Sequence, residues 1–131
     1  VAMAHIGDTG VDELTTFLLK YENDVISESH SSFMSNHTND FLIYGSKGYI
    51  RIHPAFWAST KASLIVNDQE ELTVSRPLRA SGFEYQAEEA MRCIRAGLLE
   101  SPEMSHADTL ANMELMDGIR AEIGLKYPFE K

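Results

Sequence analysis

The hydrophobic period of this sequence changes once, near Ser81-Gly82, and that change constrains the fold more than any other feature. Before it, short runs rich in Thr, Val, Ile, Phe and Tyr alternate with turn residues, which is typical of β-strands. After it, apolar residues recur at steps of three and four, as they do in amphipathic helices. Strands followed by helices predict an α+β domain.

Six runs before the change are expected to be strands. Asn23-Asp24, Ser46-Lys47-Gly48 and Asp68-Gln69-Glu70 are typical of the short turns that join antiparallel neighbours. The expected strands cover residues 13–21, 25–34, 41–45, 49–53, 62–67 and 71–75. The sequence therefore predicts one open, predominantly antiparallel sheet of six to seven strands.

Two helices are expected after the change. The first spans residues 85–100, where Ala87, Met91, Ile94 and Leu98 form one apolar stripe. Both helices are expected to pack on one face of the sheet, because each has a single apolar side to bury.

The second helix is bounded by clear start and stop signals. Ser105, with Asp108 three residues later, is a variant capping box, and Gly124 and Pro128 are typical of a helix end. Its expected apolar side consists of Leu110, Met113, Met116, Ile119 and Ile123.

Composition narrows the class of protein and its partners. The 131 residues, 44% apolar and 24% charged, predict a single globular domain. A net charge of −9 without runs of Lys or Arg disfavours nucleic acid and anionic membranes as partners. No apolar stretch approaches the roughly 20 residues that span a bilayer. The lone Cys93 indicates a reducing, cytoplasmic location.

The first residues of the sequence lack the features of a natural N-terminus. It begins at Val1, with neither Met nor a signal-like segment before "VAMAHIG". This start indicates a piece of a longer polypeptide or a processed form.

The usual catalytic and metal-binding motifs are missing from the sequence. It contains no G-x-G-x-x-G, P-loop, C-x-x-C, H-E-x-x-H or G-x-S-x-G motif. His30 and His37 could approach each other across a hairpin, but a metal site needs three or four convergent ligands. Ser29 and His30 are neighbours on an expected strand and so point to opposite faces, which excludes a direct nucleophile and base pair. We therefore expect no metal site and no catalytic residue in this chain.

Phe56-Trp57 is the one pair that we single out as a candidate site. The two aromatic residues follow "HP" in an expected loop after a strand, where large rings need either a core or a ligand to cover them. The residues alone favour packing over ligand binding.

Three stretches carry a family resemblance. "YGSKGYIRIHPAFW", "GFEYQAEEAMRCIRAGLLESPEM" and "TLANMELMDGIRAEIGLKYP" resemble the C-terminal domain of Gfo/Idh/MocA oxidoreductases, particularly the dihydrodiol dehydrogenase-like and sugar dehydrogenase-like members. The resemblance runs from about Thr9 to Pro128. It implies that residues 1–131 are a single α+β domain for substrate binding and oligomerisation, with an N-terminal Rossmann domain that binds NAD or NADP lying outside this chain.

The resemblance also bears on individual residues. The family's nucleotide fingerprint and its E-K-P motif, which carries the catalytic Lys, do not occur here, so neither catalytic nor cofactor-binding roles transfer to this chain. In related enzymes the segment matching "HPAFW" lies near the substrate cleft. Phe56 and Trp57 are therefore expected to touch substrate, and the sheet is expected to form a homo-oligomer interface.

Two classes of function remain after these arguments. The first is the C-terminal domain of a dehydrogenase that transfers hydride between nicotinamide and a sugar, polyol or diol, with no activity in this chain by itself. The second is a non-catalytic dimeric α+β scaffold or small-molecule-binding module. A self-contained hydrolase is disfavoured because no convergent nucleophile and base are present.

Overall fold

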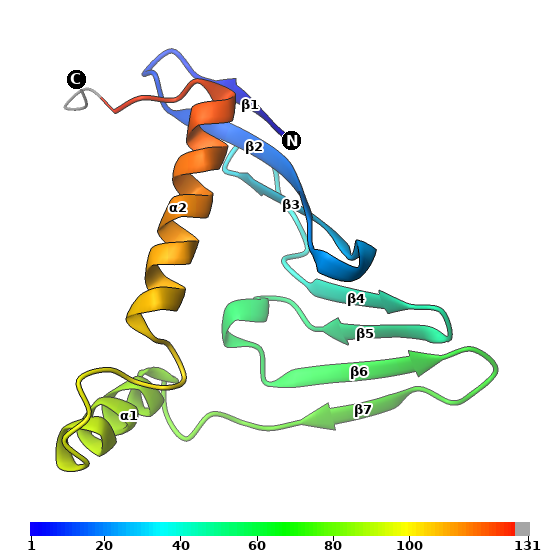
Figure 1. Ribbon diagram of the computed structural model, residues 1–131. Helices are drawn as coiled ribbons and strands as arrows, with labels where there is room; N and C mark the ends of the chain where they lie inside the picture. The colour runs from blue at the N-terminus through cyan, green and yellow to red at the C-terminus, as the bar shows by residue number, and fades with distance from the viewer. Residues whose placement is uncertain (128–131) are drawn as a thin grey trace. The chain divides into compact units, whose positions relative to one another are not determined.

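A computed structural model describes residues 1–127 of the chain. The chain divides into two compact units (Figure 1). Unit 1 combines Val1–Asn36 with Pro102–Lys131, and unit 2 is His37–Ser101. Each unit has its own antiparallel sheet and one helix.

Unit 1 contains a sheet of three strands. These are β1 (Ala2–Ile6), β2 (Asp12–Lys20) and β3 (Ile26–Ser32), in the order β1-β2-β3 and all antiparallel. The predicted strands at 13–21 and 25–34 are confirmed by β2 and β3, whereas β1 was not foreseen. A short 3-10 turn, Glu22–Asp24, joins β2 to β3. Asn23 and Asp24 in this turn adopt the left-handed conformation, which these residue types tolerate.

The helix of unit 1 is α2 (His106–Ile123), and its predicted boundaries are confirmed. Ser105 Oγ accepts a hydrogen bond from the Asp108 N–H (3.1 Å), and the Asp108 carboxylate accepts one from the Ser105 N–H (3.0 Å). Gly124, at φ 73°, ends the helix as predicted. Pro128, expected to prevent resumption, lies outside the described residues.

Only the second half of α2 lies against the sheet of unit 1. A cavity of about 320 Å³ separates β2 from α2, and its lining includes Phe17, Leu19, Leu115 and Ile119. Leu110, Met113 and Met116, which were expected on the packed side, remain exposed. The predicted stripe is therefore correct at Ile119 and Ile123 and wrong from Leu110 to Met116.

Unit 2 contains a sheet of four strands. These are β4 (Phe41–Gly45), β5 (Gly48–Ile52), β6 (Lys61–Val66) and β7 (Leu72–Ser75), paired in chain order. The sequence predicted all four. The turn between β4 and β5 requires glycine, because at Gly48 φ is 151° and a Cβ atom would lie 2.0 Å from the Ile65 carbonyl oxygen.

The helix of unit 2 is α1 (Phe83–Arg95), which is shorter than predicted. The chain leaves the helix at Ala96, and Gly97 adopts a left-handed conformation at φ 68°. Leu98 therefore lies beyond the helix rather than on its apolar stripe.

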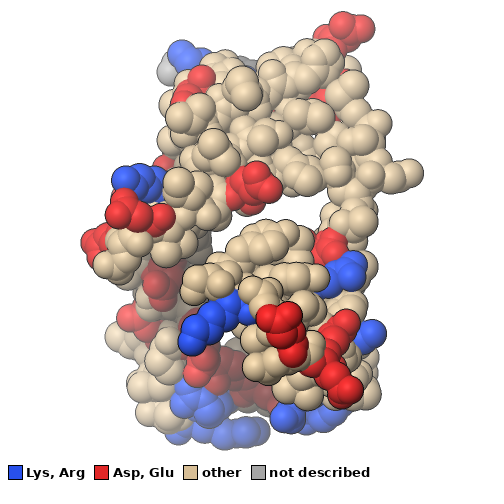
Figure 2. Space-filling view, turned by 90° about the vertical axis from the view of Figure 1, so that its right-hand side faces the viewer, with Lys and Arg blue, Asp and Glu red and all other residues tan. Residues whose placement is uncertain are grey.

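The α+β class, the antiparallel pairing and the two helices are confirmed, but the expected layout needs correction. Within residues 1–127, the seven strands form two hydrogen-bonded sheets instead of one, and each unit holds one helix. On the face shown in Figure 2, acidic and basic side chains are interspersed and broad areas carry neither. Neither α1 nor α2 is long and apolar enough to cross a membrane.

Candidate functional site

The two faces of the four-stranded sheet differ in chemistry. Directly paired residues share a face, and the register pairs Phe41 with Ile52, Ile43 with Ile50, and Leu64 with both Ile50 and Leu72. We call this side the apolar face; it consists of Phe41, Ile43, Ile50, Ile52, Ala62, Leu64, Leu72 and Val74. Most of its large side chains are exposed in the described chain.

The opposite side carries a series of hydrogen bonds that crosses three strands. His53 Nε2 lies 2.8 Å from Ser63 Oγ, Ser63 Oγ lies 2.6 Å from Thr73 Oγ1, and Thr73 Oγ1 lies 2.8 Å from Glu71 Oε1. Ser63 is only 2% exposed, so its hydroxyl depends on these partners. We call these four residues the His53–Glu71 network.

The ionised Glu71 gives the network a direction. Hydrogen bonds from Ser63 and Thr73, helped by the charges of Lys61 and His53, hold the pKa of Glu71 below its usual value. A carboxylate only accepts, so Thr73 donates to Glu71, and Ser63 directs its single proton toward Thr73 or Glu71. Ser63 Oγ must then accept from His53, so Nε2 of the His53 ring carries a proton.

Phe56 and Trp57 lie on the loop that leaves His53, in the 3-10 turn Phe56–Ala58. We call residues 54–60 the aromatic loop. The ring centroids of Phe56 and Trp57 are 5.3 Å apart in an edge-to-face arrangement, and Phe56 lies 6.0 Å from Phe41. Trp57 is 68% exposed, so the described residues leave its ring open to a ligand.

The tip of the aromatic loop is held by its backbone. The Phe56 N–H donates to the Asn39 carbonyl oxygen (3.0 Å), and the Ala58 N–H donates to the Ala55 carbonyl oxygen (2.8 Å). Ala55 has φ 58° and ψ 52°, a left-handed conformation that costs a residue with a Cβ about 1–2 kcal/mol. Such strain persists only where surrounding contacts impose it.

An ion pair holds the segment that accepts this bond. Arg51, on β5, binds Asp40 Oδ2 through Nη2 (2.7 Å) and Nε (2.8 Å), and Thr38 donates its hydroxyl to the same carboxylate. The Thr38 hydrogen bond, followed by those of Arg51, keeps the pKa of Asp40 below its usual value. Asn39 is thereby flanked by two anchored residues.

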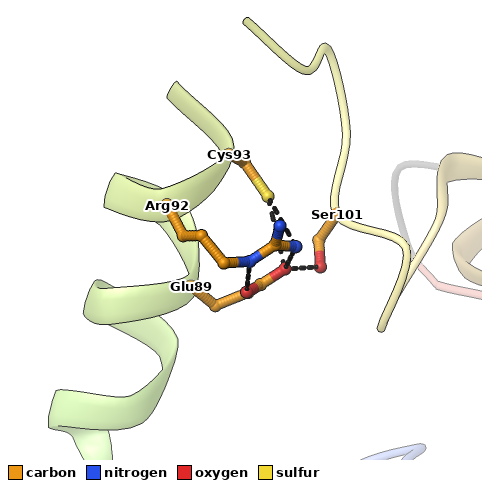
Figure 3. A network of polar contacts seen from close by, with 4 residues as sticks. All are labelled: Glu89, Arg92, Cys93 and Ser101. Carbon is orange, nitrogen blue, oxygen red and sulfur yellow. Dashed lines mark hydrogen bonds and ion pairs between the residues drawn. The ribbon is translucent and has the colours of Figure 1, made fainter. Parts of the chain in front are cut away.

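A second polar cluster joins α1 to the segment that follows it (Figure 3). The Glu89 carboxylate accepts hydrogen bonds from Arg92 (2.6 and 2.7 Å), Ser101 Oγ (2.5 Å) and Cys93 Sγ (3.3 Å). These donors, Arg92 first, lower the pKa of Glu89 to about 2, while burial raises the pKa of the Cys93 thiol. With every donor supplied from within the cluster, its role is structural.

Acid is expected to destabilise unit 2 through Glu89. Its pKa of about 2 lies below the ordinary 4.5, so the carboxylate stabilises the fold above about pH 4.5, and this contribution is lost as the pH falls toward 2. Glu89→Gln should therefore melt at a lower temperature than the parent near neutral pH and approach it in acid. Circular dichroism melts across this range, with Glu70→Gln on a surface turn as control, measure the difference. A constant gap at every pH would contradict the assignment.

The other residues considered from sequence are not brought together. His30 pairs with Thr16 and Ser29 with Phe17, on adjacent positions of β3 that face opposite sides. Among residues 1–127, no three His, Cys, Asp or Glu side chains are grouped closely enough to hold a metal ion. The His53–Glu71 network was missed, because its members are far apart in sequence and only the strand register unites them.

Comparisons with known proteins show which proteins are similar to this chain in sequence. No family model matches it. It is 35% identical over 127 residues to a trans-1,2-dihydrobenzene-1,2-diol dehydrogenase of Danio rerio, covering 92% of this chain and 37% of that protein. Proteins of the same name from Xenopus tropicalis (34% over 134 residues; 97% and 40% covered) and Homo sapiens (25% over 131 residues; 95% and 39% covered) are also similar.

The chain thus spans about two fifths of the length of these relatives, and the similarity runs through nearly all of its own length. These similarities agree with the resemblance to Gfo/Idh/MocA oxidoreductases that the sequence motifs carry.

Proposed function

We propose that this chain is the C-terminal, substrate-side domain of an NAD(P)-dependent dehydrogenase that oxidises a cyclic diol. The observation that carries the proposal is the similarity to trans-1,2-dihydrobenzene-1,2-diol dehydrogenases over more than nine tenths of the chain. Among the substrate classes that the family resemblance leaves open, the names of these relatives favour a diol over a sugar.

The nicotinamide cofactor would be held outside these 131 residues. The chain has no Gly-rich turn of the kind that places a pyrophosphate at a helix N-terminus, so its residues do not fit the cofactor. When bound, the nicotinamide exchanges a hydride with the carbinol carbon. We place both the cofactor site and the catalytic Lys in the N-terminal Rossmann domain of the full-length protein, by which we mean the polypeptide extended to the length of the relatives.

The aromatic loop is the part of this chain that we assign to substrate. A dihydrodiol offers an apolar ring with two hydroxyl groups on one edge. The exposed Trp57 ring, braced by Phe56, provides an apolar surface against which such a ring can stack. In this assignment the two aromatic residues bind and orient the ring, and no residue of the chain handles a proton.

The apolar face supports the proposal that the protein forms a homodimer. Six of its large side chains are 38–59% exposed in this chain, although such groups are ordinarily buried. A two-fold arrangement would let one such face cover another. The single Cys93 accords with a cytoplasmic location for the enzyme.

The proposal is tested by comparing the full-length protein with the 131-residue chain. The full-length protein should reduce NAD or NADP in the presence of a trans-dihydrodiol. The 131-residue chain should neither catalyse this reaction nor bind either nucleotide in a calorimetric titration. Micromolar nucleotide binding by the short chain would contradict the division of roles, and an inactive full-length protein would favour a non-catalytic scaffold.

A further inference from the structure

We propose that the His53–Glu71 network positions the aromatic loop, so that one series of hydrogen bonds across the sheet determines how tightly the enzyme holds its diol. This inference rests on the proposed function for the identity of the ligand. The link between network and loop rests on the geometry of unit 2 alone.

The network ties the base of the loop to two neighbouring strands. The ladder between β5 and β6 ends at His53, whose backbone N–H donates to the Lys61 carbonyl oxygen (3.1 Å). The His53 side chain then reaches Ser63 on β6, and Ser63 reaches Thr73 on β7. The loop therefore leaves the sheet at a residue that is fixed by both its backbone and its ring.

The fixed direction of the hydrogen bonds makes this anchor depend on every member. Glu71 accepts from Thr73, and this orients the hydroxyl of Ser63 so that its oxygen receives the Nε2 proton of His53. If the Thr73 hydroxyl is removed, Ser63 loses its bond to Thr73, and the direction of its proton then depends on Glu71 alone. The His53 ring then loses the defined acceptor that sets its orientation.

The loop tip has a separate anchor that does not involve the network. The Phe56 N–H is bound to the Asn39 carbonyl oxygen, beside the Asp40–Arg51 ion pair. Between base and tip lies Ala55, whose left-handed backbone requires both ends to be held. Releasing the base should therefore relax Ala55 and increase the motion of Trp57, even though the tip bond remains.

A purely structural network would behave differently. It would contribute to the stability of the sheet, and its loss would lower the melting temperature without a selective effect on the loop. The single Trp of the chain, Trp57, separates the two cases, because its fluorescence reports on the loop and on nothing else.

The test uses a matched set of variants at neighbouring positions of β7. Thr73→Val keeps the shape and removes the hydroxyl, Thr73→Ser restores the hydroxyl, and Ser75→Ala removes a hydroxyl from the same strand outside the network. Time-resolved fluorescence anisotropy of the 131-residue chain should show greater fast motion of Trp57 in Thr73→Val alone. Circular dichroism checks that each variant is folded. Glu71→Ala, which removes the acceptor of the Thr73 hydroxyl at an exposed position, replaces Thr73→Val if that variant is not folded.

The kinetic arm uses the full-length protein. Thr73→Val should raise KM for the dihydrodiol about tenfold, the effect of about one hydrogen bond, while kcat and KM for the nucleotide stay unchanged. Unaltered Trp57 motion would overturn the positioning role whether or not the enzyme is active. Greater motion with an unchanged substrate KM would overturn its link to the ligand. An inactive parent enzyme would refute the proposed function while leaving the fluorescence result to decide whether the network holds the loop.

Discussion

Trp57→Ala in the full-length protein is expected to lower kcat/KM for a trans-dihydrodiol by about 30-fold, because truncating an aromatic anchor of a binding site costs about 2 kcal/mol or more. The ring is 68% exposed in this chain and packs edge-to-face on Phe56, so its removal leaves the fold intact but removes a stacking surface. Steady-state kinetics with the diol and the nucleotide varied in turn measure the effect.

The control for this substitution is Tyr44→Ala. Tyr44 is similarly exposed (74%), lies on β4 of the same unit, and packs its ring against Tyr49 in a tilted arrangement instead of against the aromatic loop. Its removal should leave kcat/KM for the diol unchanged. If Trp57→Ala alters only the KM of the nucleotide, the assignment of the loop to substrate is wrong.

Ile50→Asp is expected to convert the proposed dimer into a monomer. Ile50 lies on an inner strand of the apolar face, between Ile43 and Leu64. A carboxylate at this position would be buried without a partner in each copy, which costs several kcal/mol and raises the dimer Kd by about 100-fold or more. Light scattering of the 131-residue chain, with a monomer mass of 14.7 kDa, follows the change.

Leu42→Asp provides a closely matched control. Leu42 and Ile50 are both 38% exposed and lie on neighbouring strands, but the register places Leu42 opposite Arg51, on the other side of the sheet. The dimer should survive this change. A parent chain that stays monomeric at high concentration, or a dimer that only Leu42→Asp disrupts, would show that the apolar face is not the interface.

Features set by local sequence were predicted well. The Ser105 and Asp108 capping box and the left-handed Gly124 depend on a few neighbouring residues, so their signals are complete within a short window. The strand pairs of unit 2 follow from alternation and turn residues in the same way. The first helix was predicted too long because its apolar spacing continues to Leu98, past the Gly97 that ends it.

Features set by distant contacts were missed. Strand β1 offers only Met3 and Ile6 as large apolar residues, and its pairing with β2 defines it better than its own pattern. The seven strands fall into two sheets because β3 and β4, although consecutive in the chain, do not pair with each other. No short sequence pattern shows whether two consecutive strands pair. Ser63 and Thr73 were present in two predicted strands, and an explicit register for those strands would have placed them side by side.

The order of segments in unit 1 has a consequence for biosynthesis. Its strands come first in the chain and its helix last, with Ile6 and His106 separated by 100 positions that include all of unit 2. Contacts between such distant segments form slowly, because a large loop must close before they are made. During synthesis on the ribosome, the four-stranded sheet of unit 2 can form before α2 has been synthesised, so β1 and β2 are present without the helix that packs on them. Until α2 is made, Phe17 and Leu19 on β2 remain uncovered. We expect a nascent-chain chaperone to bind unit 1 at this apolar side of β2.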